Sequence, residues 1–238
     1  IQFIDRVYSV FGLSYRIELS TRPEKKYIGD LAIWEQSEKA LADACVHAGK
    51  DYKVNPGDGA FYGPKLDFHI KDSLGREWQC GTIQLDMNLP ERFDLTYVEK
   101  DGSKVRPVML HRVIFGSIER FIGILIEHFA GHFPVWLAPQ QVSVVPVHHE
   151  KHLGYANEVH EKLCALGFRS KLDARNEKLG YRIREAQLSK IPYQLVIGDG
   201  EIENRSVTLR RAQSRESITM SLDDFIAMME KAVKEKKL

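Results

Sequence analysis

The sequence is poor in the features that mark secreted, membrane-embedded and strongly basic proteins. Its three cysteines, Cys45, Cys80 and Cys164, are odd in number and widely spaced, which argues against a disulfide framework and for a reducing compartment. No apolar run reaches the roughly 18–20 residues that span a bilayer, and the first residues lack the pattern of a secretory signal. We therefore expect a cytoplasmic protein.

Neither charge nor composition identifies a partner. The formal net charge of the 238 residues is only +1, and 43% hydrophobic with 28% charged residues is ordinary for a globular protein. This length allows two modest domains, each with its own core. The chain begins at Ile1 without an initiator Met, so we expect it to be part of a longer protein.

The first half predicts helices packed on an antiparallel sheet. Residues 1–13 and 31–48 have the apolar spacing of helices, and residues 15–20 alternate as a strand does. Between residues 51 and 108, short alternating runs are broken by Gly, Pro and Asp, which is typical of an antiparallel meander.

The second half has a different rhythm. A proline-containing connector at residues 132–140 is followed by strands that alternate with helices, which predicts a mixed or parallel sheet covered on both faces. We therefore expect an α/β protein with two domains, residues 1–135 and residues 136–238.

One run near the middle combines apolar residues with a single cation. Residues 113–129 predict a helix that is apolar nearly all round, and Arg120 interrupts it between Gly116 and Gly123. Each helical Gly costs about 0.8–1 kcal/mol relative to Ala, so bare backbone beside a guanidinium suggests a site for a flat or phosphorylated molecule. The alternative is a close helix-packing groove in which Arg120 pairs with an acid.

The residues of this run resemble a known motif. Gly116-Ser117-Ile118-Glu119-Arg120-Phe121 is similar to motif 3 of the class II aminoacyl-tRNA synthetases, which we place at residues 105–130, and residues 111–125 resemble its threonyl-tRNA synthetase version. The resemblance implies that Arg120 lies over the adenine and near the γ-phosphate of ATP. It also assigns Ser117 to the ATP site.

Two upstream segments extend the resemblance. The glycine-rich run at residues 57–68 is similar to the segment of the threonyl enzymes that brings Tyr62 to the amino acid and Lys65 to the phosphates. By spacing alone, this run is also compatible with a glycine-rich hairpin that has Tyr62 in the core.

The second segment is Trp78 to Asp86. Strict alternation on a strand would place Trp78, Cys80, Thr82, Gln84 and Asp86 on one face and Gln79 on the other. The polar face could simply be open to solvent. The resemblance instead implies that Gln79 lies near ATP and Mg²⁺, and that Thr82 and Gln84 lie near threonine.

Two candidate metal ligands receive different interpretations. Cys80 has no CxxC partner, so we interpret it as a small buried side chain. His111 alone could be a structural histidine. The resemblance implies that it is one of three ligands of a catalytic Zn²⁺, and the other two, a Cys and a His, are absent from this chain.

The second domain is expected to bind RNA. Residues 169–190 contain seven Lys or Arg against three acids, which could attract a phosphate backbone or could form an ordinary solvated helix face. Asn176 precedes the helix predicted at residues 177–189, where it could cap the helix or read a base edge. The resemblance is to the anticodon-binding domain of the synthetases for Thr, Pro, His and Gly, and it assigns Asn176, Glu201 and Arg210 to the anticodon.

The resemblance covers nearly the whole chain and implies an activity for the longer protein. This activity is ATP-dependent ligation of threonine to tRNA(Thr) through a threonyl-adenylate, by a homodimer that uses Zn²⁺ and Mg²⁺. Motifs 1 and 2 are absent, so we expect this chain alone to be inactive. The alternatives are a prolyl, histidyl or glycyl enzyme and a nucleic-acid-binding relative without catalysis.

Overall fold

A computed structural model describes residues 1–214 and 216–238 of the chain. These residues form two compact units, Ile1–His128 and Phe129–Leu238, and each unit is described by itself. The domain boundary expected between residues 135 and 136 lies inside the connector at the start of the second unit, and it stays a prediction. The mixed α/β class expected from the sequence is confirmed.

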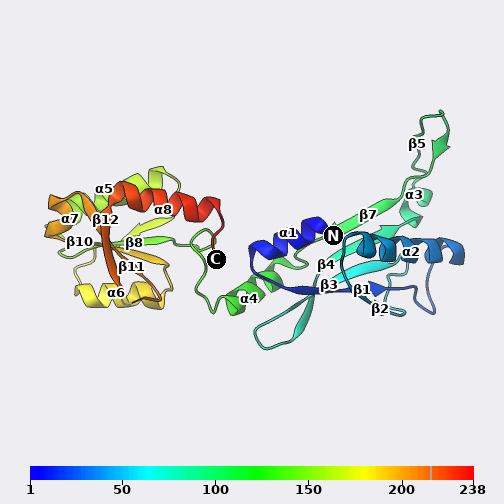
Figure 1. Cartoon of the computed structure of the whole chain (residues 1–238), viewed down its shortest axis with the longest axis horizontal. Coiled ribbons are helices and arrows are strands. Elements are labelled where there is room, and N and C mark those ends of the chain that lie inside the picture. The colour runs from blue at the N-terminus through cyan, green and yellow to red at the C-terminus, as the bar shows by residue number, and fades with distance from the viewer. Residues whose placement is uncertain (215) are drawn as a thin grey trace. The chain divides into compact units, whose positions relative to one another are not determined.

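The first unit is built on a five-stranded sheet with the order β2-β1-β3-β4-β7 (Figure 1). Its helices are α1 (Gln2–Val10), α2 (Leu31–His47), α3 (Asn88–Arg92) and α4 (Ile118–His128). Its strands are β1 (Tyr15–Ser20), β2 (Tyr52–Asn55), β3 (Lys65–Lys71), β4 (Glu77–Asp86), β5 (Tyr97–Val98), β6 (Lys104–Val105) and β7 (Met109–Val113). All pairs are antiparallel except β1 with β2, so the antiparallel sheet expected from residues 51–108 is confirmed apart from β2, which pairs in parallel with β1.

The two faces of this sheet differ in chemistry. Ile17, Leu66, Phe68 and Ile70 are almost fully buried, and they share one face because side chains alternate along a strand. The helices α1 and α2 lie on this side (Figure 1), where the Tyr15 ring packs 5.6 Å from the Phe68 ring. The opposite face carries the charged and amide side chains of β3 and β4.

A β-bulge in β4 changes which side chains share that polar face. Phe68 is opposite Gly81, but the next residue of β3, His69, is opposite Gln79, so Cys80 is an extra residue in the strand. The extra residue brings Gln79 onto the same face as Thr82. The strict alternation expected from the sequence, which separates these two side chains, is therefore wrong.

The run that contains Arg120 also differs from the prediction. Residues up to Val113 form β7, a turn follows, and α4 begins only at Ile118. Gly116 lies in the turn with φ +66°, and a Cβ there would come 2.8 Å from the carbonyl oxygen of Cys80. Gly116 is therefore required by the turn rather than by a bare strip on a helix, and the predicted strip is wrong.

The surface of α4 is amphipathic rather than apolar and buried all round. Phe121, Ile124 and Leu125 are buried, whereas Ile118, Ile122 and Ile126 are 62%, 47% and 47% exposed. The four-residue spacing places the three exposed isoleucines on one side of the helix. The expectation of an element buried on all sides is wrong for this unit.

The second unit has three layers (Figure 1). Its strands are β8 (Val142–Pro146), β9 (Ser170–Leu172), β10 (Tyr193–Ile197), β11 (Ser206–Arg211) and β12 (Ser217–Ser221), in the order β12-β11-β10-β8-β9. Its helices are α5 (Leu153–Ala165), α6 (Leu179–Leu188), α7 (Asp199–Glu203) and α8 (Leu222–Lys234). The strand β8 is parallel to β9 and β10, and the remaining pairs are antiparallel, as in the mixed sheet expected.

The core of this unit lies under α5 and α8. Val159 and Leu163 of α5 and Phe225 and Met229 of α8 are fully buried against apolar residues of β8, β10 and β11. The helix α6 contacts β8 and lies on the other face of the sheet in Figure 1. None of the helices in the described part of the chain has both the length and the apolar character needed to cross a bilayer.

Candidate functional site

Strand register gathers most of the predicted catalytic residues on the polar face of the first sheet. Lys65 of β3 is directly opposite Gln84 of β4, and Gln84 is directly opposite His111 of β7. Two pairs along, and on the same face, Asp67 is opposite Thr82. These side chains therefore form one continuous layer across three strands.

Asp67 holds together the side chains in one half of this layer. Its side chain is 1% exposed and accepts hydrogen bonds from the Lys65 ammonium (2.7 Å), the Gln79 amide (2.5 Å) and the Thr82 hydroxyl (3.1 Å). The Ser20 hydroxyl of β1 also donates to it, at 2.8 Å. A single buried carboxylate thus fixes the positions of three predicted site residues.

The charge of Lys65 is maintained by its neighbours. Burial by itself would lower the pKa of Lys65, but the hydrogen bond to Asp67 and the charges of Asp67 and Asp58 together raise it above the ordinary value. The ammonium therefore stays protonated near neutral pH and can attract phosphate oxygens.

Tyr62, Gln84 and His111 form the other half of the layer. The Tyr62 hydroxyl donates to the Gln84 side-chain oxygen at 2.9 Å, and the rings of Tyr62 and His111 meet edge to face, with centroids 6.0 Å apart. Gly63, next to Tyr62, packs against β4 so closely that a Cβ would come 1.8 Å from the Leu85 carbonyl oxygen. This glycine therefore makes room for protein backbone and not for a bound molecule.

The orientation of the His111 ring is set by Asp86. The Nε2 atom lies 2.9 Å from the fully buried carboxylate of Asp86, which can only accept, so Nε2 carries the proton and Nδ1 has the free lone pair in the neutral ring. Metal-binding histidines are commonly held by a carboxylate in this way. No group of three His, Cys, Asp or Glu side chains among the described residues could enclose a metal ion, so His111 can supply one ligand here.

Arg120 lies beside the first residues of β4, which extend beyond the end of β7. Its guanidinium donates to the Gln79 carbonyl oxygen at 3.3 Å and lies 5.4 Å from the centre of the Trp78 ring. In the described part of the chain Arg120 forms no ion pair with an acid, and its side chain is exposed. The alternative in which this cation is neutralised in a packing groove is therefore not what the structure contains.

Ser117 has a structural function at the start of α4. Its hydroxyl donates to the Glu119 carboxylate at 2.8 Å and accepts from the Arg120 backbone amide at 3.4 Å. These bonds satisfy groups that the first turn of a helix leaves free. Ser117 thereby positions the turn that carries Arg120.

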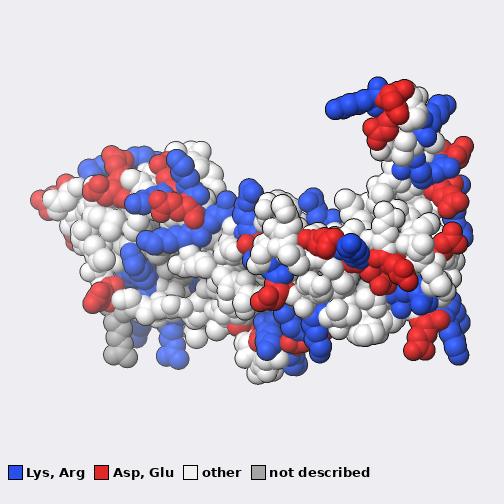
Figure 2. All heavy atoms as spheres, turned by 45° about the vertical axis from the view of Figure 1, so that its right-hand side comes forward, with Lys and Arg blue, Asp and Glu red and all other residues white. Residues whose placement is uncertain are grey.

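In the second unit, the basic segment at residues 169–190 is less available than its composition suggests. Arg175 pairs with Asp173 and Glu185, and the buried Arg182 donates to three backbone carbonyls. Arg169 and Lys190 also donate to backbone carbonyls. On the face shown in Figure 2, Lys and Arg side chains are interspersed with Asp and Glu. Of the seven basic residues, Arg182 is buried and Arg175 is paired with acids, whereas Arg169, Lys171, Lys178, Arg184 and Lys190 are exposed and keep their charge. The basic surface expected here is therefore smaller than seven residues, and its role in RNA binding stays a prediction.

The three predicted anticodon contacts occupy different elements. Asn176 is exposed in the loop before α6, and it does not cap that helix, because the N-cap residue is Lys178. Glu201 lies in α7, where its carboxylate accepts from the Gly198 amide and the Thr208 hydroxyl. Arg210 lies on β11, two residues beyond Thr208 and on the same face.

Several buried polar atoms at and beside Arg210 have no hydrogen-bond partner among the described residues. Its cross-strand neighbour, Gln194, is 0% exposed, and both polar atoms of the Gln194 side chain and the Arg210 Nε lack a partner in the described part of the chain. Burial alone would raise the pKa of Glu201, but hydrogen bonds from Thr208 and Gly198 lower it below the ordinary value, so this carboxylate is charged at neutral pH. Arg210 and Gln194 thus offer hydrogen-bond donors, and Glu201 a fixed acceptor, on one side of the sheet.

Asp67 and Asp86 hold candidate site residues by hydrogen bonds, and the sequence analysis did not single them out. Both lie on the polar face, where a carboxylate in an alternating strand is usually interpreted as solvent-facing. The available signal was the i, i+2 spacing of Lys65 and Asp67, which predicts two side chains on one face of a strand.

Comparisons with known proteins identify the family of both parts of the chain. A model of the class II tRNA synthetase core domain (G, H, P, S and T) matches residues 1–129, and a model of the anticodon-binding domain matches residues 141–232. The threonine–tRNA ligase of Fusobacterium nucleatum is 60% identical over 227 residues, which are 94% of this chain and 36% of that protein. The threonine–tRNA ligase of Acetivibrio thermocellus is 56% identical over 236 residues, 99% of this chain and 37% of that protein.

Solved structures of threonyl-tRNA synthetases also match this chain. The RNA-binding domain of threonyl-tRNA synthetase from Cryptosporidium parvum matches 97% of this chain and 58% of its own, with a TM-score of 0.91 and 40% identity. A putative threonyl-tRNA synthetase from Aeropyrum pernix matches 99% of this chain and 61% of its own, with a TM-score of 0.75 and 27% identity. The chain spans a little over a third of the length of the curated relatives that it matches. It belongs to the class II aminoacyl-tRNA synthetases, and within that family it matches the threonine–tRNA ligases.

Proposed function

We propose that this chain supplies part of the active site and the anticodon-binding domain of an enzyme that joins threonine to tRNA(Thr). The observation that carries the proposal is the convergence of Lys65, Gln79, Gln84 and His111 on one face of β3, β4 and β7, beside an unpaired Arg120. In the proposed reaction, the threonine carboxylate attacks the α-phosphate of ATP and releases pyrophosphate. The threonyl group then passes from the adenylate to the terminal ribose of the tRNA.

Such a reaction needs positioning and charge stabilisation rather than a protein nucleophile. Arg120 is proposed to stack on the adenine and to face the γ-phosphate, with Lys65 and Gln79 near the phosphates and Mg²⁺. The supporting facts are an Arg120 guanidinium that forms no ion pair among the described residues and the protonated Lys65 ammonium held by Asp67. Ser117 is also proposed to belong to the ATP site, where its hydroxyl holds the first turn of the helix that bears Arg120.

The same proposal assigns the amino-acid side of the site. Tyr62, Gln84 and Thr82 are proposed to contact threonine, and His111 to provide one ligand of a Zn²⁺ ion whose other protein ligands come from outside this chain. The free lone pair on Nδ1 supports this assignment. A bound zinc ion would supply a Lewis acid that accepts the substrate hydroxyl, which an apolar pocket cannot recognise strongly. A homodimer and a cytoplasmic location belong to the same proposal.

A joined protein tests the activity directly. The part of the Fusobacterium nucleatum ligase that precedes its match to this chain would be fused to residues 1–238, with the intact Fusobacterium enzyme as the positive control. We expect exchange of labelled pyrophosphate into ATP with threonine, and a rate with valine about 10⁴-fold lower because valine lacks the hydroxyl. Exchange driven by proline, histidine or glycine would favour the other members of the group. Complete absence of exchange would favour a non-catalytic relative.

The anticodon assignment gives a separate prediction. Replacing Asn176 with alanine is expected to weaken binding of tRNA(Thr) to the chain about tenfold, because a side-chain hydrogen bond to a base edge is lost. Filter binding at one fixed salt concentration measures this, since affinity for RNA depends strongly on salt. Asn157→Ala is the matched control, because Asn157 lies within α5 and donates to Glu161. Equal losses in the two variants would contradict the assignment.

A further inference from the structure

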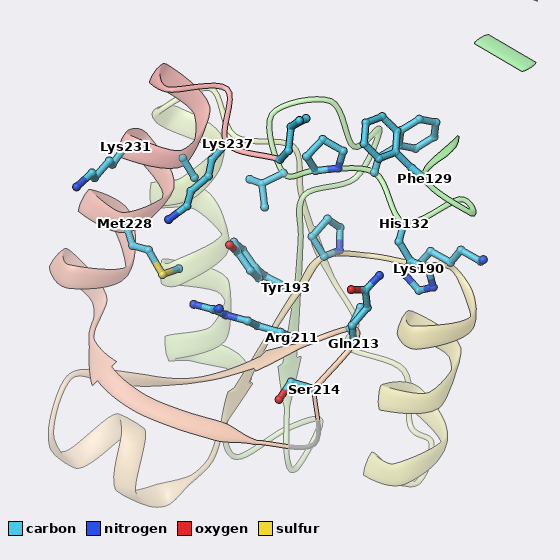
Figure 3. A pocket seen from close by; sticks show the side chains of 17 residues that line it. Phe129, His132, Lys190, Tyr193, Arg211, Gln213, Ser214, Met228, Lys231 and Lys237 are labelled. Atoms are coloured by element: carbon cyan, nitrogen blue, oxygen red, sulfur yellow. The ribbon is translucent and has the colours of Figure 1, made fainter. Parts of the chain in front are cut away.

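One cavity of the second unit is lined by none of the site residues assigned above. Its volume is about 480 Å³, within the range of about 300–1,000 Å³ typical of small-molecule sites. It is bounded by the connector, the start of β10, the end of β11 and the last turns of α8 (Figure 3).

The lining combines flat apolar groups with cations. Its apolar part includes the rings of Phe129, Phe133 and Tyr193 and the prolines Pro134 and Pro192. Its charged part consists of Lys190, Arg211, Lys231 and Lys237, and none of the described lining residues is Asp or Glu. A cavity with this lining favours a planar molecule that carries negative charge.

Two donors face the interior together. Tyr193 and Arg211 are directly opposite each other on β10 and β11, and Figure 3 shows both side chains in the cavity, with Lys237 directed toward the same side. No hydrogen bond of the Tyr193 hydroxyl and no ion pair of Arg211 or Lys237 is formed within the described part of the chain. Burial raises the pKa of Tyr193 despite the opposing effect of Arg211, so the hydroxyl keeps its proton.

The neighbouring cations are arranged differently. The Lys190 ammonium donates to the backbone carbonyl of Ala130, and Lys231 points away from the cavity in Figure 3. Arg211 and Lys237 therefore supply the positive charge inside. A guanidinium, a phenol and an ammonium that face one region match the several acceptor oxygens of a phosphate group.

We propose that this cavity binds a nucleoside monophosphate unit, with its phosphate at Arg211, Tyr193 and Lys237 and its base against Phe133 and the two prolines. The unit is either a free nucleotide or one nucleotide of a bound RNA strand. This site is separate from the one beside Arg120 and does not depend on the proposed ligase activity.

Calorimetric titration of residues 1–238 with AMP tests the proposal. All measurements would use an Arg120→Ala background, so that binding to the first unit is suppressed. We expect saturable binding that weakens about tenfold or more in Arg211→Gln and severalfold in Tyr193→Phe, because hydrogen bonds to a charged group are lost. Lys234→Gln is the matched control, since Lys234 is an exposed residue of α8 outside the cavity lining.

Other probes separate the chemical groups and the two sources. Adenosine should bind at least tenfold more weakly than AMP, and equal affinity would overturn the phosphate assignment. A short single-stranded oligoribonucleotide that binds more tightly than AMP, with the same dependence on Arg211, identifies RNA as the source, whereas a preference for AMP identifies a free nucleotide. The proposal is overturned if AMP does not bind, or if Arg211→Gln and Lys234→Gln bind it equally. Tyr193→Phe keeps the ring contact with Phe225, so a loss of affinity in that variant is not a loss of the fold.

Discussion

Replacing Arg120 with alanine is expected to lower threonine-dependent pyrophosphate exchange by the joined protein about 100- to 1,000-fold. The reason is that one preorganised donor to a charged transition state typically contributes this much to the rate. The side chain is exposed, and among the described residues it donates to the Gln79 carbonyl alone, so its removal should leave the fold intact. The measurement is kcat/KM for ATP at saturating threonine, together with a thermal unfolding curve.

Arg76 provides a matched control for this experiment. Its guanidinium lies 5.8 Å from the same Trp78 ring, but it is paired with Asp72 and Glu127. Arg76→Ala should therefore leave the exchange rate within a few-fold of the unmodified protein. An Arg120→Ala protein that exchanges as fast as the Arg76→Ala protein would remove Arg120 from the nucleotide site.

The second large effect concerns stability. Replacing Asp67 with alanine should lower the free energy of unfolding of the first unit by about 3–5 kcal/mol, the usual cost of removing one partner of a buried ion pair. Lys65, whose side chain is only 16% exposed, would lose its main partner, and Gln79 and Thr82 would lose theirs. Urea unfolding followed by the fluorescence of Trp34 and Trp78, in a Trp136→Phe background, measures the change.

The double variant Asp67→Ala/Lys65→Met separates the buried charge from the rest of the network. It should recover part of the lost stability, because no uncompensated ammonium remains. A loss below about 1 kcal/mol in Asp67→Ala would mean that water replaces the carboxylate at little cost, and Asp67 would then not be the residue that fixes the site.

Local sequence patterns predicted the regular elements well. The strand at residues 15–20 has the expected bounds, and α1, α2, α4 and α6 lie within the ranges in which helices were expected, whereas the short helices α3 and α7 were not predicted. The predicted elements have periodic apolar residues and clear breaks at their ends, so local information is sufficient. The error at residues 113–117 has a tertiary cause, because β7 is defined by pairing with β4 and its turn by the contact of Gly116 with Cys80.

The composition of the site was harder to predict from residues alone. Alternation assigns Gln79 to the wrong face because it cannot detect the bulge at Cys80, which is visible only in the pairing with β3. The basic segment was overestimated because composition does not reveal that Arg182 is buried and that Arg175 is paired. The roles expected of Tyr62, Lys65 and His111 came from the family resemblance. The structure adds Asp67, which accepts from Lys65, and Asp86, which accepts from His111.

Asp86 connects the ring of His111 to the beginning of α3. Its Oδ2 atom accepts from the imidazole, while its Oδ1 atom accepts from the backbone amides of Asn88 and Leu89. Both oxygens belong to one rigid planar group, so a rotation that releases the helix also withdraws the acceptor from the ring. The first turn of α3 and the orientation of the His111 ring therefore depend on the same carboxylate, and we expect a substitution in α3 that moves Asp86 to turn the imidazole as well.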